Sequence, residues 1–255
     1  VRSYLKPTAA IFADTNYEPS KVAVDSGNNI YIVSEGVYAG VIQLANTGKF
    51  LGYFTSNKSK LTPQQMFLKL IYTKEQEKKS ELLNTLPSTF SNVFVDTNGT
   101  AYSTCMGIGS DLLKKHSTNG TNMLGDVKTS SALTDVTANK DGIIYASDSH
   151  GMIWVYTSQG EVIFQLGAEA ADKDISGLFT SLTTIAVDNS GNIWTADGEK
   201  GYLQSFTPTE YATTIFKALK EYENGDYKEA LTDWNYVLRL NQMSVLAHNG
   251  VAKAY

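Results

Sequence analysis

The feature that most constrains this chain is a sequence pattern that recurs four times along its 255 residues. The copies occupy residues 22–32, 93–103, 135–146 and 185–195. In each copy an alternating apolar run leads into a turn rich in Asp, Asn and Gly, and a second alternating run follows. Alternation with a period of two is typical of β-strands, and these turn residues tolerate positive φ angles. We therefore predict four β-hairpins of one repeated type.

The spacing of the copies predicts the larger unit to which each hairpin belongs. The turn glycines Gly99, Gly142 and Gly191 are 43 and 49 residues apart. A second hairpin follows three of the copies, with turns at residues 46–48 and 118–120 and at residues 158–160. Four antiparallel strands in about 45 residues is the period of a β-propeller blade. The predicted fold class is therefore mainly β with a helical C-terminus.

Six blades would need about 250 to 290 residues, and four units are visible. We therefore expect a fragment of a six-bladed ring, with two blades missing before Val1. Residues 7–13 are predicted to form one outer strand. This strand would either end a blade whose earlier strands are missing or close the last blade, whose chain passes into helix after Phe206.

The interval between the first two copies is longer by about 25 residues, which predicts an insertion at residues 58–86. Thr62 with Gln65, and Thr73 with Gln76, have the spacing of capping boxes at helix N-termini. We therefore expect two short helices here. They would either pack an apolar stripe on a blade edge or form a cap that binds a partner.

From Ala212 onward the apolar period changes from 2 to 3.6, which predicts helices. Small and aromatic residues between positions 218 and 241 follow a spacing that resembles the tetratricopeptide (TPR) family. In such a repeat, Gly225 and Ala230 would let two helices approach, and Tyr227 and Trp234 would fill the gap between them. Residues 244–255 resemble the first helix of a second repeat, so we expect the natural protein to continue beyond Tyr255.

The repeated hairpins resemble the NHL family over roughly residues 19–207. The matching features are a Val-Asp-x-x-Gly-Asn-Ile-Tyr/Trp core and an aspartate at the strand end, Asp148 or Asp197. The chain departs from that family because no copy continues with Asn-x-Arg-Ile, and Ser34-Glu35 and Thr104-Cys105 replace the strand-end Asp in the first two copies. The predicted domains are NHL-like propeller blades at residues 1–211 and TPR helices at residues 212–255.

This order of parts resembles a group of bacterial propeller–TPR proteins that often carry a Yip-type membrane domain. The shared parts are a helical insert with Gln76, the junction at residues 206–210 and the run 218–241. The resemblance implies an extracellular location at a Gram-positive cell surface and an association with carbohydrate uptake systems. The membrane anchor that it implies lies outside this sequence.

Charge and cysteine content exclude several other classes. The formal net charge is −5, and the densest basic run, residues 74–79, is interrupted by Glu75 and Glu77. Phosphate backbones need clustered cations, so a nucleic-acid partner is not expected. Cys105 is the single cysteine, which excludes an intrachain disulfide. We predict that it is a buried blade residue with nothing basic nearby to lower its pKa.

Candidate site residues lie at equivalent strand ends, where they would line the mouth of a propeller channel. They are Glu35, Asp148 and Asp197, together with His150, which follows Asp148 closely. Propeller lyases and gluconolactonases resemble this architecture and hold a divalent metal with such side chains. The simpler interpretation is that the aspartates cap turns and that His150 is a solvated loop residue. Turn-forming is likewise the predicted role of the aspartates in the hairpin loops, Asp25, Asp96, Asp141 and Asp188.

The sequence supports two functions of different classes. The first is a non-catalytic binding or scaffold module, which would hold protein or peptide partners on a propeller face and in a TPR groove, or a carbohydrate on exposed aromatic rings. The tryptophans Trp154 and Trp194 are predicted to be inner-strand core unless they reach the channel mouth. The second is a metal-dependent propeller hydrolase or lyase. No cofactor is predicted for the binding module, whereas the second function would use a divalent metal ion such as Ca²⁺.

Overall fold

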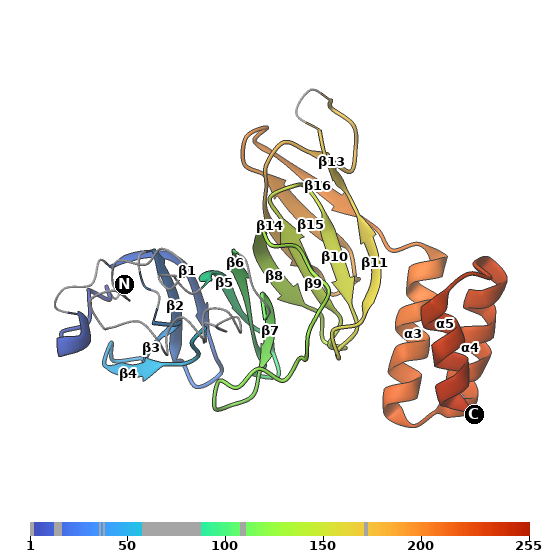
Figure 1. Cartoon of the computed structure of the whole chain (residues 1–255), viewed down its shortest axis with the longest axis horizontal. Coiled ribbons are helices and arrows are strands. Elements are labelled where there is room, and N and C mark those ends of the chain that lie inside the picture. Colours follow the sequence, from blue (N-terminus) through green and yellow to red (C-terminus); the bar gives the residue numbers. More distant parts are fainter. Residues whose placement is uncertain are drawn as a thin grey trace, which may run out of the picture. The chain divides into compact units, whose positions relative to one another are not determined.

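The computed structural model describes residues 3–12, 17–35, 37, 39–57, 88–107, 111–170 and 173–255. The chain forms two compact units, Val1–Thr134 and Asp135–Tyr255, and each is considered by itself. The predicted helical insertion at residues 58–86 lies outside the described residues, so its two helices remain a prediction. The elements carry the labels of Figure 1.

The first unit contains two antiparallel meander sheets. One has the strand order β1 (Glu18–Val24), β2 (Ile30–Glu35), β3 (Ile42–Leu44) and β4 (Phe50–Tyr53). The other has the order β5 (Thr89–Val95), β6 (Ala101–Met106) and β7 (Leu113–His116). The first two predicted hairpins are therefore confirmed as β1–β2 and β5–β6.

The predicted outer strand at residues 7–13 is wrong. The chain forms a short 3-10 helix there, η1 (Ala10–Phe12), closed by a bond from the Phe12 N–H to the Ala9 carbonyl at 2.9 Å. Phe12 is fully buried on the first sheet, and its ring meets that of Phe50 edge-on at 4.9 Å. Covering this apolar sheet face with a large ring outweighs the weak alternation that suggested a strand.

The second unit begins with a four-stranded sheet in the order β11-β10-β9-β8, and a three-stranded sheet in the order β14-β15-β16 follows. A short parallel pair, β12 with β13, lies between them in the sequence. The two larger sheets share a core in which Tyr145, Ile153 and Ile185 are buried. The strand bounds are β8 (Leu133–Ala138), β9 (Ile144–Asp148), β10 (Ile153–Tyr156), β11 (Val162–Leu166), β12 (Ala168–Glu169), β13 (Leu178–Phe179), β14 (Leu182–Val187), β15 (Ile193–Asp197) and β16 (Tyr202–Phe206).

Three helices follow, α3 (Glu210–Asn224), α4 (Tyr227–Leu240) and α5 (Val245–Ala254), and they are the red and orange helices of Figure 1. The side chain of Thr209 caps the first of them by accepting a bond from the N–H of Ala212 at 3.4 Å. Trp234 is buried between helices as predicted, whereas Tyr227 is 50% exposed. Gly225 does not serve close helix approach. It ends α3 at φ 87°, a conformation that favours glycine.

The part of the chain that the structure describes is thus mainly β, with sixteen strands in five sheets and three C-terminal α-helices. All four predicted hairpins are present, and two of the four sequence repeats form complete four-stranded sheets. In the fourth repeat three strands form, and the chain then enters α3 instead of a fourth strand. None of the helices described is long and apolar enough to cross a membrane.

Candidate binding site at the junction of sheet and helix

The hairpin turns share one hydrogen-bonding device. In three of the four copies, an aspartate at the turn accepts a bond from the backbone N–H four residues later and a second bond from an aromatic side chain six residues later. The N–H bonds are 2.8 to 3.0 Å long, and the aromatic bonds are 2.9, 3.4 and 3.0 Å. The pairs are Asp25 with Tyr31, Asp96 with Tyr102, and Asp188 with Trp194.

The third copy has Asn139 at this position, and its side-chain oxygen accepts the N–H groups of Asp141 and Ile143 at 3.0 Å each. The aromatic residue six positions later is Tyr145, which is 1% exposed. Its hydroxyl has no hydrogen-bond partner among the residues described. An amide presents one acceptor oxygen where a carboxylate presents two, so the second bond of the device is lost. Burial, with the charge of Asp141, raises the pKa of Tyr145, and the phenol is neutral.

Tyr145 forms part of the wall of a cavity of about 270 Å³ in the second unit. The cavity lies where β11, the turn before β15, the end of β16 and the start of α3 meet. Its wall contains no Asp, Glu, Lys, Arg or His side chain. The lining residues are Tyr145, Phe164, Gln165, Leu166, Gly191, Ile193, Phe206, Thr207, Pro208, Thr209, Tyr211, Ala212 and Phe216.

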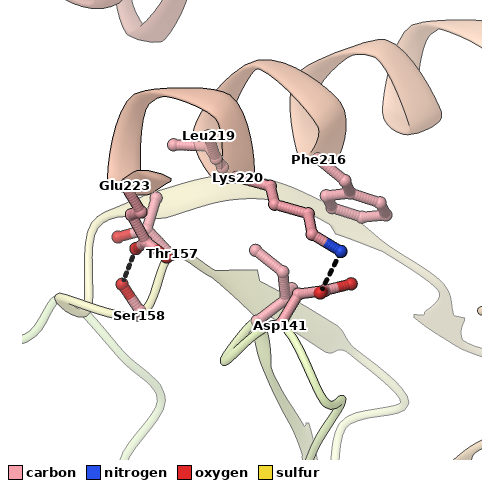
Figure 2. Close-up of a pocket in the computed structure, with 8 residues that line it drawn as sticks. Asp141, Thr157, Ser158, Phe216, Leu219, Lys220 and Glu223 are labelled. Atoms are coloured by element: carbon pink, nitrogen blue, oxygen red, sulfur yellow. Dashed lines mark hydrogen bonds and ion pairs between the residues drawn. The ribbon is translucent and has the colours of Figure 1, made fainter. Parts of the chain in front are cut away.

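Beside this cavity, polar contacts join α3 to the turns of the sheet, as Figure 2 shows. The ammonium of Lys220 lies 2.8 Å from the carboxylate of Asp141, and the Ser158 hydroxyl bonds to Glu223. The remaining space there is about 10 Å³, room for about one water molecule. These contacts join α3 to the turns of the sheet, and the start of the same helix forms one wall of the larger cavity.

Two of the four predicted site residues, Asp148 and Asp197, accept several hydrogen bonds from nearby groups of the protein. Asp148 is 3% exposed and accepts the N–H groups of His150 and Met152 at 3.0 Å, together with the indole of Trp154 at 3.1 Å. Asp197 is buried and accepts four backbone N–H groups between positions 180 and 200, which lower its pKa against the effect of burial.

The other two predicted residues, His150 and Glu35, are exposed. His150 follows the end of β9, and Glu35 is the last residue of β2 in the first unit. Within the residues described, no three His, Cys, Asp or Glu side chains form a group that could hold a metal ion. A role for these residues in ligand binding stays a prediction.

Two buried polar pairs escaped the sequence analysis because each joins neighbouring strands. The Ser103 hydroxyl lies 2.8 Å from Nε2 of His116, and burial lowers the pKa of this histidine to about 4. Both residues are buried and the ring of Phe54 lies 5.3 Å from the imidazole, so the pair is part of the core. The expectation that nothing basic lies near Cys105 is wrong, because the charge of buried Lys114 acts on the thiol. Burial still raises the pKa of Cys105 overall.

Trp194 corrects another expectation, because it is 44% exposed and is not core. The spacing of six residues between turn and aromatic residue was the available signal for the device. The spacing identifies Tyr145 as the exception once Asn139, and not the predicted Asp141, is recognised as the residue whose side chain accepts the turn N–H groups.

No family model and no curated protein sequence matches the chain. Among solved structures, a protein of unknown function from Bacteroides caccae has a TM-score of 0.52 at 11% identity, over 77% of this chain and 59% of that one. A catalytically inactive virginiamycin B lyase from Staphylococcus aureus with quinupristin has a TM-score of 0.48 at 11% identity, over 78% and 59%.

The extracellular domain of a hybrid two-component system from B. thetaiotaomicron has a TM-score of 0.49 at 12% identity, over 82% and 26%. This chain therefore spans less than two thirds of each of these three proteins. At such identities the likeness concerns the fold alone, and of the three the first exceeds a TM-score of 0.5. The four-stranded antiparallel meanders described above have the strand order of a β-propeller blade.

Proposed function

We propose that the chain is a non-catalytic binding module, built from NHL-type propeller blades and TPR-type helices, that holds a protein partner at a bacterial cell surface. The observation that carries this proposal is the cavity of about 270 Å³ between sheet and helix. Ligand sites in proteins are typically concave and apolar, with a few polar groups that set orientation. Protein partners commonly anchor themselves by one buried side chain in such a pocket.

The chemistry of the wall favours a protein partner over the other two ligand classes. A carbohydrate carries many hydroxyl groups, and burying them without partners costs free energy. The cavity wall offers few polar groups to match them. A metal-dependent hydrolase or lyase would need free carboxylate oxygens at Glu35, Asp148 or Asp197, or a free imidazole nitrogen at His150, and the two buried aspartates already accept three or four bonds each.

The experiment is selection of a phage-displayed random peptide library against the whole chain. Enriched peptides are then measured on two variants that place tryptophan at an exposed threonine. Thr207→Trp narrows the cavity at its rim, and Thr213→Trp lies on α3 away from the cavity. We expect peptides that bind the parent chain and Thr213→Trp and fail on Thr207→Trp. Selection of no peptide, or equal binding to both variants, would contradict the proposal.

A thermal-shift arm with Ca²⁺ and Mg²⁺ tests the alternative enzyme. Stabilisation by either ion that is lost on Asp148→Ala or Asp197→Ala would move the function to a channel-centred metal site. Bound ligand raises stability by mass action, about 2.7 kcal/mol at one hundred times Kd, so a specific site would be detected. We expect no shift that depends on these two aspartates.

A further inference from the structure

The sheets of the third and fourth repeats pack together through one defined pair of faces. Tyr145 and Ile153, on β9 and β10 of the third repeat, share a buried core with Ile185 and Ile193, on β14 and β15 of the fourth. The face that a repeat presents to the repeat after it is called here its trailing face. The face that it presents to the repeat before it is its leading face.

The trailing face of the fourth repeat is exposed. The strand registers place Trp194 and Leu203 where the third repeat has Tyr145 and Ile153. Both residues of the third repeat are buried, whereas Trp194 is exposed and Leu203 is 70% exposed. Trp194 and Leu203 are diagonal neighbours on adjacent strands, close enough for such side chains to touch, and Ala186 lies opposite Trp194 on β14. They form one apolar patch on this face.

The leading face of the first repeat is exposed along its first strand. Val22 and Val24 on β1 hold the places of Ile185 and Val187 on β14. Both valines are exposed, Val22 to 64%. The other strands of this sheet are covered on the same face by the segment that carries Phe12. The first strand is therefore the part of this face that a partner can reach.

A polar link between the third and fourth repeats has its counterparts at the two exposed faces. Asp135 accepts the N–H of Ile185 at 2.9 Å and also accepts the hydroxyl of Thr184. In the fourth repeat Thr184 holds the place of Asp135, and in the first repeat Val22 holds the place of Ile185. The Thr184 hydroxyl uses its proton on Asp135, and its oxygen can still accept the Val22 N–H of another chain.

We propose that the trailing face of the fourth repeat binds the leading face of the first repeat in a second copy of this chain, head to tail. The contact continues the interface between the third and fourth repeats, because the chain exposes the counterparts of both of its sides. Such a contact is heterologous, so further copies can add in the same way or close a ring. Trp194, Leu203 and Val22 do not line the cavity, which makes this inference independent of the proposed function.

The test measures self-association of the whole chain by sedimentation equilibrium. Leu203→Lys places a charge in the trailing face, and Val22→Lys places one in the leading face. Both side chains are exposed, so the variants should fold, which circular dichroism and thermal melting check. Thr213→Lys, at an exposed position on α3, is the matched control.

We expect the parent chain and Thr213→Lys to associate with the same concentration dependence. Each face variant alone should associate at least about 10-fold more weakly, because its lysine would be buried without a partner. A mixture of the two face variants contains one intact pair of faces, the trailing face of Val22→Lys and the leading face of Leu203→Lys. The mixture should associate more tightly than either variant alone and stop at two chains.

Three results would overturn the inference. The first is a parent chain that stays monomeric up to about 1 mM, the weak end of specific association. The second is a mixture that associates no better than the separate variants. The third is Val22→Lys that associates as tightly as the parent, since the contact would then join two trailing faces or lie elsewhere.

Discussion

The carboxylate of Asp188 accepts a hydrogen bond from Nε1 of Trp194 at 3.0 Å, across the turn that joins β14 to β15. This bond, with those from Asn192 and Ser190, lowers the pKa of Asp188 to about 2. Since the pKa of an unfolded aspartate is about 3.9, the bonds stabilise the fold above that pH, and their contribution is lost as the pH falls through about 2.

Replacing Asp188 by Asn should therefore reduce the dependence of stability on pH between about 4 and 2. The amide cannot titrate, although it also loses one acceptor for the indole. Urea unfolding at several acidic pH values measures the effect, and Asp126→Asn, at an exposed aspartate in the first unit, is the control. An acid limb identical to that of the parent chain would show that the turn does not hold the carboxylate ionised.

The lowered pKa of His116 predicts a second pH dependence of folding stability, at higher pH. Burial lowers the pKa of this histidine to about 4, against about 6.5 in the unfolded chain. The folded state therefore requires the neutral ring, and stability that is present above pH 6.5 declines as the pH falls towards 4. His116→Gln should flatten thermal stability between these values. His150→Gln, at an exposed site, should leave the decline unchanged, and a decline that persists in His116→Gln would contradict the assignment.

Tyr145→Phe should stabilise the free protein. The hydroxyl is buried without a partner, so its removal is expected to raise the free energy of unfolding by about 1 kcal/mol. Tyr31→Phe is the matched control with the opposite sign, because its hydroxyl donates to Asp25 at 2.9 Å and accepts from Gln43 at 3.1 Å. Chemical denaturation of both variants decides the point. Destabilisation of equal size in both would mean that Tyr145 has an internal partner.

Glu221 should destabilise the helices at neutral pH. Burial and the nearby charge of Asp233 raise the pKa of Glu221, while Lys217 offsets part of this effect. The stabilising contribution of protonated Glu221 is fully present below the unfolded pKa of about 4.3. It is lost as the pH rises through the raised pKa of the folded state. Glu221→Gln should therefore increase the free energy of unfolding at pH 7 by about 0.5 kcal/mol, which a higher melting temperature would report. At pH 4 the melting temperature should be unchanged. A drop at pH 7 would show that the Lys217 pair dominates.

Gly250 sets how closely α5 packs on α4. A Cβ atom at this position would overlap the indole ring of Trp234, so Gly250→Ala should cost about 1–3 kcal/mol. Trp234→Phe makes room, and the double variant should be more stable than the sum of the two single changes predicts. Thermal unfolding followed by circular dichroism at the helix signal gives the three values. Simple additivity would mean that the helices adjust around the new methyl group.

The repeated hairpins could be predicted from the sequence because their signals are local, namely alternation and turn residues. The segment before Ala13 could not, because Phe12 packs on strands more than fifteen residues away and forms a 3-10 turn to reach them. The cavity was beyond sequence reasoning too, since its walls come from two sheets and α3. The sequence contains the cause of the unpaired Tyr145 hydroxyl, because Asn139 stands where the other three copies have Asp. The effect of that difference is recognised only from the side-chain bonds that those aspartates make in the structure.

The link between β16 and α3 has a consequence for the thermodynamics of recognition. The strand ends at Phe206 and the helix begins at Glu210, so three residues separate them, and the φ of Pro208 is fixed by its ring. All three linker residues line the cavity, and the ion pair of Lys220 with Asp141 holds the far side of the helix. The two walls are therefore ordered when the chain folds. An incoming side chain loses its own rotamer freedom but does not need to order the receptor, so more of the contact free energy remains as affinity.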